Sequence, residues 1–144
     1  MARTQKPMEV ELVERHLGSC LCGKVRFEIA GGFEHFFLCH CSRCRKGSGS
    51  AHGANLFATN AEIAWLLGEG NVTSFALAGM RHARSFCATC GGALPSIQGQ
   101  FLIVPAGSLD TPLAKRPDAH ICAASRADWD RALESVPSFD ALPS

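Results

Sequence analysis

The 144-residue sequence lacks the features that mark a membrane protein, a nucleic-acid-binding protein or a disordered chain. It contains no run of the ~18 apolar residues that a membrane-spanning helix needs. It has no excess of one charge, since 14 Lys and Arg side chains face 13 Asp and Glu side chains, and a large basic field that would attract nucleic acid or a membrane surface is therefore missing. With 47% hydrophobic residues it is too apolar to stay unfolded. We expect a globular protein without nucleic-acid or membrane partners.

The first 14 residues lack the apolar stretch of a secretory signal, because charged side chains interrupt them throughout. We therefore expect a cytoplasmic protein. In a reducing compartment, thiols more often bind a metal or act in catalysis than form disulfides.

Cysteine is the residue that this sequence has in excess, with 8 in the chain. Seven of them form three clusters, and Cys122 stands alone: Cys20-Leu-Cys22, Cys39-His-Cys41-Ser-Arg-Cys44 and Cys87-Ala-Thr-Cys90. Residues i and i+2 of a strand point to the same side, and Cys-x-x-Cys brings two sulfurs together in a tight turn. Three such clusters in a short chain predict zinc binding.

The remaining sequence predicts short strands rather than long amphipathic helices. Polar and apolar residues alternate over 24–29, which is typical of a half-buried strand. The other expected strands are 36–38, 54–58, 63–67, 72–77, 83–86, 93–97, 101–104 and 120–123. Residues 45–51 are expected to form a polar, glycine-rich loop, and only residues 125–134 are expected to be helical.

Seven clustered cysteines divide naturally into a site of four ligands and a site of three. A closed site of four thiolates is structural, whereas three thiolates leave one coordination position for water or substrate. Spacing alone does not fix which clusters pair. Cys39, Cys41 and Cys44 are close enough in sequence to form a three-ligand site, which would leave Cys20, Cys22, Cys87 and Cys90 for the other.

The cysteine motifs, read in order, resemble the glutathione-dependent formaldehyde-activating enzyme (GFA) family, whose domain also occurs in centromere protein V. The resemblance is carried by the segments 18–27, 39–46, 86–91, 106–110 and 120–129. It covers about residues 10–140 and implies a single GFA-type zinc-binding domain there, with tails at 1–9 and 141–144. The implied fold is mainly β, a β-tent of several small coiled antiparallel sheets with little helix.

The resemblance also implies an activity and two sets of ligands. Cys20, Cys22, Cys87 and Cys90 match the structural zinc ligands of the family, and Cys39, Cys41 and Cys44 match its catalytic zinc ligands. We therefore expect two zinc ions per chain, with the three-cysteine site partly empty if its metal is lost or its thiols oxidise. The implied reaction joins glutathione, or another small thiol, to a small aldehyde. With formaldehyde it gives S-hydroxymethylglutathione, as a carbon–sulfur lyase working in reverse.

Two alternatives remain open from the sequence. Cys39, Cys41 and Cys44 could form a second structural site, completed by His40, His52 or Cys122. The protein would then be a zinc-stabilised binding module without catalytic activity. The same chemistry could also act on a different thiol or aldehyde. We expect Cys122 itself to be a small buried residue in a strand.

The residues that flank the second cluster are weaker candidates. His52 follows the glycine-rich loop and could reach the open position as a ligand or proton carrier. His40 lies between two cysteines and is expected to point the other way, toward a supporting or solvent-exposed position. Arg45 and Lys46 are the predicted substrate-binding residues, because they could attract the carboxylates of glutathione. Arg43 is expected to lie in a solvated loop.

Overall fold

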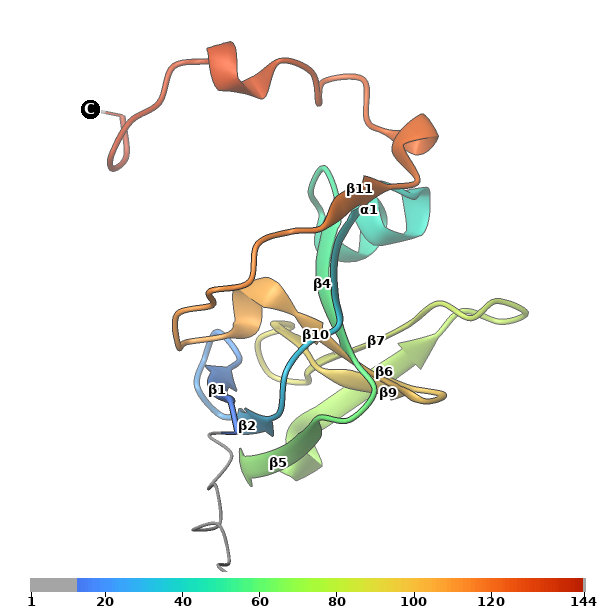
Figure 1. The fold of residues 1–144 in the computed structure, drawn as a ribbon, viewed down its shortest axis with the longest axis vertical. Coiled ribbons are helices and arrows are strands. Elements are labelled where there is room, and N and C mark those ends of the chain that lie inside the picture. Colours follow the sequence, from blue (N-terminus) through green and yellow to red (C-terminus); the bar gives the residue numbers. More distant parts are fainter. Residues whose placement is uncertain (1–12, 144) are drawn as a thin grey trace, which may run out of the picture.

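Eleven short strands make up most of the regular structure in residues 13–143, the part of the chain that the computed structural model describes (Figure 1). The strands are β1 (Arg15–Ser19), β2 (Arg26–Ala30), β3 (His35–Cys39), β4 (Gly53–Ala58), β5 (Glu62–Leu67), β6 (Val72–Ala76), β7 (Ala83–Cys87), β8 (Ala93–Leu94), β9 (Ser96–Gln98), β10 (Phe101–Pro105) and β11 (Ala119–Ile121). One α-helix, α1 (Ser42–Ser48), and four 3-10 turns (Glu69–Asn71, Ala106–Ser108, Ala123–Ser125 and Leu133–Ser135) complete the described elements. The expected mainly β fold with little helix is confirmed.

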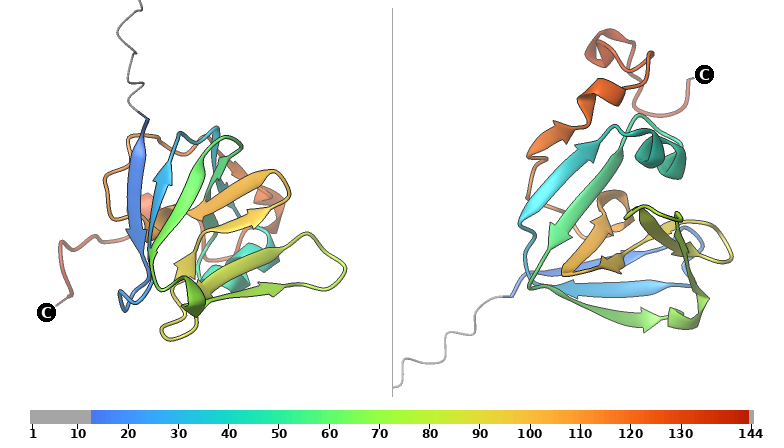
Figure 2. Two further views of the ribbon diagram at one scale, coloured as in Figure 1. Left: turned by 90° about the horizontal axis from the view of Figure 1, so that it is seen from below. Right: turned by 90° about the vertical axis from the view of Figure 1, so that its right-hand side faces the viewer.

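The strands form three small sheets, which Figure 2 shows from two further sides. Their strand orders are β1-β2-β5, β11-β3-β4-β10-β9 and β6-β7-β8. Neighbouring strands are antiparallel, except that β11 runs parallel to β3. The central five-stranded sheet therefore joins residues near 37 to residues near 120.

The hydrophobic core covers one face of the five-stranded sheet. Phe36 of β3 lies opposite Leu56 of β4, which in turn lies opposite Val104 of β10, and all three are buried. They pack with Phe27 and Ile29 of β2. Since side chains alternate along a strand, the residues between them point to the other face of the sheet. That second face is free to form a binding site.

Two predictions about helices are wrong. Residues 45–51 were expected to form a loop, but α1 covers most of them, because the Cys41 side chain accepts a hydrogen bond from the Cys44 amide at the helix start. Gly49, at φ 65°, ends the helix in the left-handed conformation. The expected helix at 125–134 is absent: this stretch has only 3-10 turns at its ends, with Ala132 at φ 49°. The segment is held instead by side-chain contacts such as that of Asp130 with His40, described below.

Cys122 also differs from its prediction. It lies one residue beyond β11, with an exposed side chain and a left-handed backbone at φ 54°. The strand is only three residues long, so it ends before Cys122 could point into the sheet. The one α-helix among residues 13–143 has seven residues and is too short to cross a membrane.

Candidate functional site

Four cysteines from two distant turns meet in what we name the four-thiol cluster: Cys20, Cys22, Cys87 and Cys90. Cys20 and Cys22 lie in the turn between β1 and β2, whereas Cys87 ends β7 and Cys90 follows it. All four sulfur atoms lie within 4.8 Å of one another. The sulfurs of Cys20 and Cys22 are 3.7 Å apart, and those of Cys22 and Cys87 are 3.9 Å apart. Thiols at this spacing could hold a metal ion.

Two similar turns bring these sulfurs together. Gly23 donates its amide hydrogen to the Cys20 carbonyl, at 3.2 Å, and Gly91 does the same to the Cys87 carbonyl, at 2.8 Å. Both glycines have φ between 70° and 80°, at 79° and 74°, a conformation that favours glycine. The glycine that follows each cysteine pair therefore lets the chain turn back and point two sulfurs in one direction.

Backbone amides already favour thiolate in the four-thiol cluster. The amides of Cys22 and Gly92 lower the pKa of Cys90 to about 6. The Lys24 amide also acts to lower the pKa of Cys22, but burial and the neighbouring thiols outweigh it and raise that pKa to about 11. The first thiolate thus forms readily, whereas further negative charge needs a cation among the sulfurs.

Cys39, Cys41 and Cys44 form a second group, the three-thiol cluster, with sulfurs within 4.8 Å of one another. Cys39 is the last residue of β3, Cys41 caps α1, and Cys44 lies in its first turn. The helix that sequence reasoning missed is therefore the element that turns Cys41 and Cys44 toward Cys39. Neither His52 nor Cys122 belongs to this group.

Burial and hydrogen bonding act in opposite directions on these three thiols. Burial raises the pKa of Cys39 and of Cys44. Burial also acts to raise the pKa of Cys41, but the amide of Cys44, the neighbouring thiols and the Arg43 charge lower it overall. Cys41 is consequently the thiol that gives up its proton first.

A cavity of about 380 Å³ opens beside the three-thiol cluster, and all three of its cysteines line it. The free face of the five-stranded sheet forms its floor. Cys39 pairs with Gly53 of β4, and Phe37 pairs with Asn55, so these positions share one face with the cavity residue Phe57. A Cβ atom on Gly53 would lie 3.3 Å from Cys44 Cβ, so glycine keeps this side of the cluster open. No member of the four-thiol cluster lines this cavity.

The cavity changes the list of charged candidates. Arg43, expected in a solvated loop, lines it, whereas Arg45 and Lys46 do not. The other basic lining residues, Arg81, His82 and Arg84, come from the β6–β7 hairpin. Sequence reasoning missed them because only folding brings the hairpin to α1.

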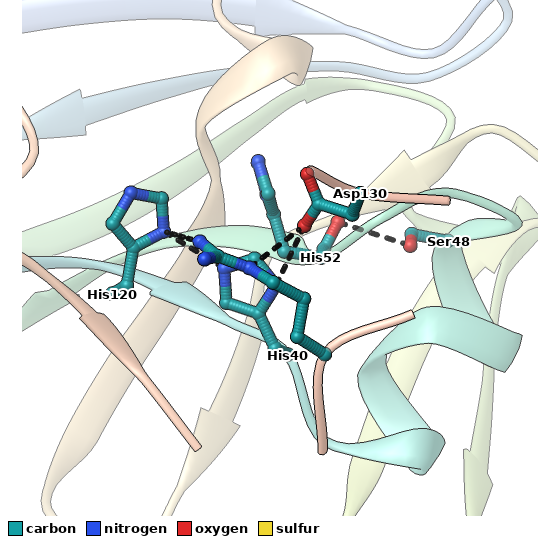
Figure 3. Close-up of polar contacts among 6 residues, drawn as sticks. His40, Ser48, His52, His120 and Asp130 are labelled. Atoms are coloured by element: carbon teal, nitrogen blue, oxygen red, sulfur yellow. Dashed lines mark hydrogen bonds and ion pairs between the residues drawn. The ribbon is translucent and has the colours of Figure 1, made fainter. Parts of the chain in front are cut away.

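His40, which lies between Cys39 and Cys41 in the chain, contacts His120 and Asp130 from the C-terminal part of the protein (Figure 3). Its side chain is fully buried, with Nε2 2.8 Å from Nδ1 of His120 and Nδ1 3.3 Å from a carboxylate oxygen of Asp130, an ion-pair contact outside hydrogen-bond geometry. Arg126 Nε donates to the same Asp130 oxygen at 3.1 Å. Burial, together with the charge of Arg126, lowers the pKa of His40. The imidazole is thus held neutral inside the protein, so of the two positions expected for His40 the structure has the supporting one and not the solvent-exposed one.

His52 lies with this histidine group and does not line the cavity. Its ring centroid is 5.1 Å from that of His40 and 6.4 Å from that of His120. Its carbonyl accepts a hydrogen bond from the Ser48 hydroxyl at 3.1 Å, as Figure 3 shows. The structure therefore places His52 beside His40 and outside the lining of the cavity.

The chain is similar to known proteins in sequence and in fold. The sequence model of the family described as glutathione-dependent formaldehyde-activating enzyme matches residues 15–125. A Halomonas elongata protein that carries this enzyme name provisionally is 29% identical over 124 residues, which covers 78% of this chain and 77% of the relative. A crystal structure of a Rhodobacter sphaeroides protein matches with a TM-score of 0.56 at 21% identity, over 72% of this chain and 98% of the other. At that identity the structural likeness concerns the fold alone.

Proposed function

The chain belongs to the glutathione-dependent formaldehyde-activating enzyme family, and from this premise we propose that it joins a small thiol to a small aldehyde reversibly. Glutathione and formaldehyde are the proposed pair, named by the family and by the Halomonas relative. The reaction forms a bond between the thiol sulfur and the carbonyl carbon. The thiol proton ends on the carbonyl oxygen, which gives S-hydroxymethylglutathione, and cleavage is the carbon–sulfur lyase direction.

The observation that carries this proposal is the contact between the three-thiol cluster and the cavity. Its three cysteines line a space of about 380 Å³, whereas the four-thiol cluster lines none of it. We assign Cys20, Cys22, Cys87 and Cys90 as ligands of a structural ion, and Cys39, Cys41 and Cys44 as ligands of a catalytic one. Only the second set can present an ion to a substrate.

Zinc fits the donor sets of both clusters. Sulfurs at ~2.3 Å from a tetrahedral zinc ion lie about 3.8 Å from one another. The separations of 3.7 and 3.9 Å in the four-thiol cluster match that spacing. Bound by three thiolates, zinc would supply an open position that polarises an aldehyde oxygen or stabilises a substrate thiolate.

Residues of the chain itself also contribute to the proposed reaction. The thiol of Cys41, with its lowered pKa, provides the first negative charge for the ion. The sheet floor, with Phe37 and Phe57, gives the reactants an apolar surface that limits water. Gly53 leaves room beside Cys44 for a substrate sulfur. Holding sulfur and carbonyl carbon in contact lowers the entropic part of the barrier.

The test is an exchange measurement by magnetisation-transfer NMR on glutathione, formaldehyde and their adduct. The zinc-loaded protein should speed the exchange above the protein-free rate in proportion to its concentration. The Lys46→Gln variant, changed at an exposed position outside the cavity, should do the same. A zinc-replete protein that left the exchange rate unchanged would refute the proposed reaction and favour a zinc-stabilised binding module.

A further inference from the structure

The cavity beside the three-thiol cluster carries charge of one sign. Four basic side chains line it, and no aspartate or glutamate does: Arg43, Arg81, His82 and Arg84. A cavity with walls of low polarity concentrates the field of such charges and attracts anions. The whole chain, by contrast, has a formal net charge of only +1. The positive charge in the cavity is therefore a local feature that the composition does not reveal.

The three arginines have no acidic partner within residues 13–143. The ion pairs there involve Arg15, His40, Lys115 and Arg126, and none includes an arginine of the cavity. The guanidinium of Arg84 lies over the ring of Phe86, at 5.1 Å from its centroid. That contact orients the guanidinium and leaves its charge uncompensated.

The basic groups also converge from two elements. A Cβ atom on Gly47 of α1 would lie 3.6 Å from Arg84 Cδ and 3.9 Å from His82 Nε2, so the hairpin packs against the helix. Burial lowers the pKa of His82, and the charges of Arg43 and Arg84 lower it further. Both arginines are thus near one imidazole, which stays neutral at pH 7 and leaves the positive charge to them.

We propose that Arg43 and Arg84, with the more exposed Arg81, bind a carboxylate of the substrate while its sulfur lies at the three-thiol cluster. This inference rests on the proposed function and names the residues that would select a thiol with carboxylates, such as glutathione, over a neutral thiol. Guanidinium groups match carboxylates through paired N–H donors, which a neutral thiol cannot use. Arg43 is next to Cys44 in the chain, so the anion site and the metal site share α1.

The test compares binding of S-methylglutathione with binding of its dimethyl ester, by isothermal titration calorimetry on the zinc-loaded protein. The methylated sulfur cannot become a thiolate, so the measurement reports the carboxylate contacts. For Arg84→Gln and for Arg43→Gln we expect about a tenfold loss of affinity for the diacid, the size of one hydrogen bond to a charged group, and less than about twofold for the diester.

Lys46→Gln is the matched control, because it removes the same charge from the same helix at an exposed position outside the cavity. Its affinity for either ligand should change less than about twofold. Zinc content and melting temperature show whether each variant is intact. Should Arg43→Gln lose zinc through its neighbour Cys44, Arg84→Gln and Arg81→Gln decide the question. Equal losses for diacid and diester, an equal loss in Lys46→Gln, or no binding of the diacid by the parent protein would overturn the inference.

This experiment separates the inference from the reaction itself. Arginine-dependent binding of the diacid without thiol–aldehyde exchange would refute the proposed reaction and support the anion site. The parent protein and the arginine variants could also catalyse the exchange with the same preference for glutathione over its dimethyl ester. That result would support the reaction and refute the anion site.

Discussion

The four-thiol and three-thiol clusters differ in the length of chain that each one joins. The four-thiol cluster connects the β1–β2 turn to the end of β7, so that Cys22 and Cys87 are 65 residues apart. The three-thiol cluster lies within the short segment 39–44. A metal ion in the first therefore joins two sheets, whereas an ion in the second closes a single loop. Metal binding contributes to folding mainly in the first case.

The two clusters also differ in what lies beside them. Both use glycines, but for different purposes: Gly23 and Gly91 turn the chain around the four-thiol cluster, whereas Gly53 leaves space beside Cys44. Only the three-thiol cluster lines the cavity with its arginines. The same thiol group thus serves a closed arrangement in one region and an open arrangement in the other, and the surrounding backbone decides which.

The largest effect is expected for Cys90→Ser, which removes one thiol from the four-thiol cluster. A serine hydroxyl stays protonated near pH 7 and is a poor zinc ligand. Because the ion joins distant strands, we expect the free energy of unfolding to fall by several kcal/mol and the melting temperature to fall by roughly 10 °C or more. Differential scanning calorimetry on the zinc-loaded protein measures it. A stable, zinc-replete variant would contradict the structural role.

Cys44→Ser makes the same chemical change in the three-thiol cluster. Exchange between glutathione, formaldehyde and their adduct should fall to the protein-free rate, because two thiolates hold zinc too weakly. The melting temperature should change by only a few degrees, which corresponds to about 1 kcal/mol in the free energy of unfolding. Elemental analysis should find one zinc fewer than in the parent protein. If Cys44→Ser unfolds as fully as Cys90→Ser, both clusters are structural.

Asp130→Asn tests whether the contact between Asp130 and His40 supports the three-thiol cluster. Asp130 is buried and contacts both His40 and Arg126, so its charge helps to hold the loop between Cys39 and Cys41. We expect the free energy of unfolding to fall by about 1–3 kcal/mol and zinc to leave the three-thiol cluster faster when a chelator is added. Asp128→Asn, at an exposed position two residues away, is the control and should leave both unchanged. If Asp130→Asn and Asp128→Asn change stability and zinc release equally, Asp130 does not support the loop between Cys39 and Cys41.

The smallest effect is expected for Gly53→Ala, which narrows the space beside Cys44. The added methyl group would lie 3.2 Å from Asn55 Nδ2 and 3.3 Å from Cys44 Cβ. If the crowding raises the activation free energy by about 1 kcal/mol, the exchange should slow about fivefold without loss of zinc. Gly107→Ala meets no atom within 4 Å and should leave the rate unaltered. An unchanged rate in Gly53→Ala would mean that substrate does not use this side of the cluster.

Much of this arrangement could be predicted from the sequence because it depends on local spacing. Cys20-x-Cys22 and Cys87-x-x-Cys90 each place two sulfurs together within one turn, and period-2 alternation marks β2. The fold class and the family followed from these signals. The start of α1 was missed because its cap is a cysteine and glycines lie within and after it.

The parts that could not be predicted depend on contacts between distant residues. His40 and His120 are 80 residues apart, and nothing in the order of residues near either one indicates their contact. Arg84 reaches the cavity because the hairpin packs against Gly47 of α1. A charged residue beside a cysteine motif, such as Lys46, is visible in the sequence, but the direction of its side chain on the helix is set by folding.

Cadmium-113 NMR of the cadmium-loaded protein tests the contrast between a closed and an open thiol site most directly. We predict two resonances, one for each cluster. Addition of glutathione should shift only the resonance that is absent from Cys44→Ser, because a substrate sulfur can reach only the three-thiol cluster. If glutathione shifts the resonance that survives in Cys44→Ser, or shifts neither one, the three-thiol cluster is not the open site.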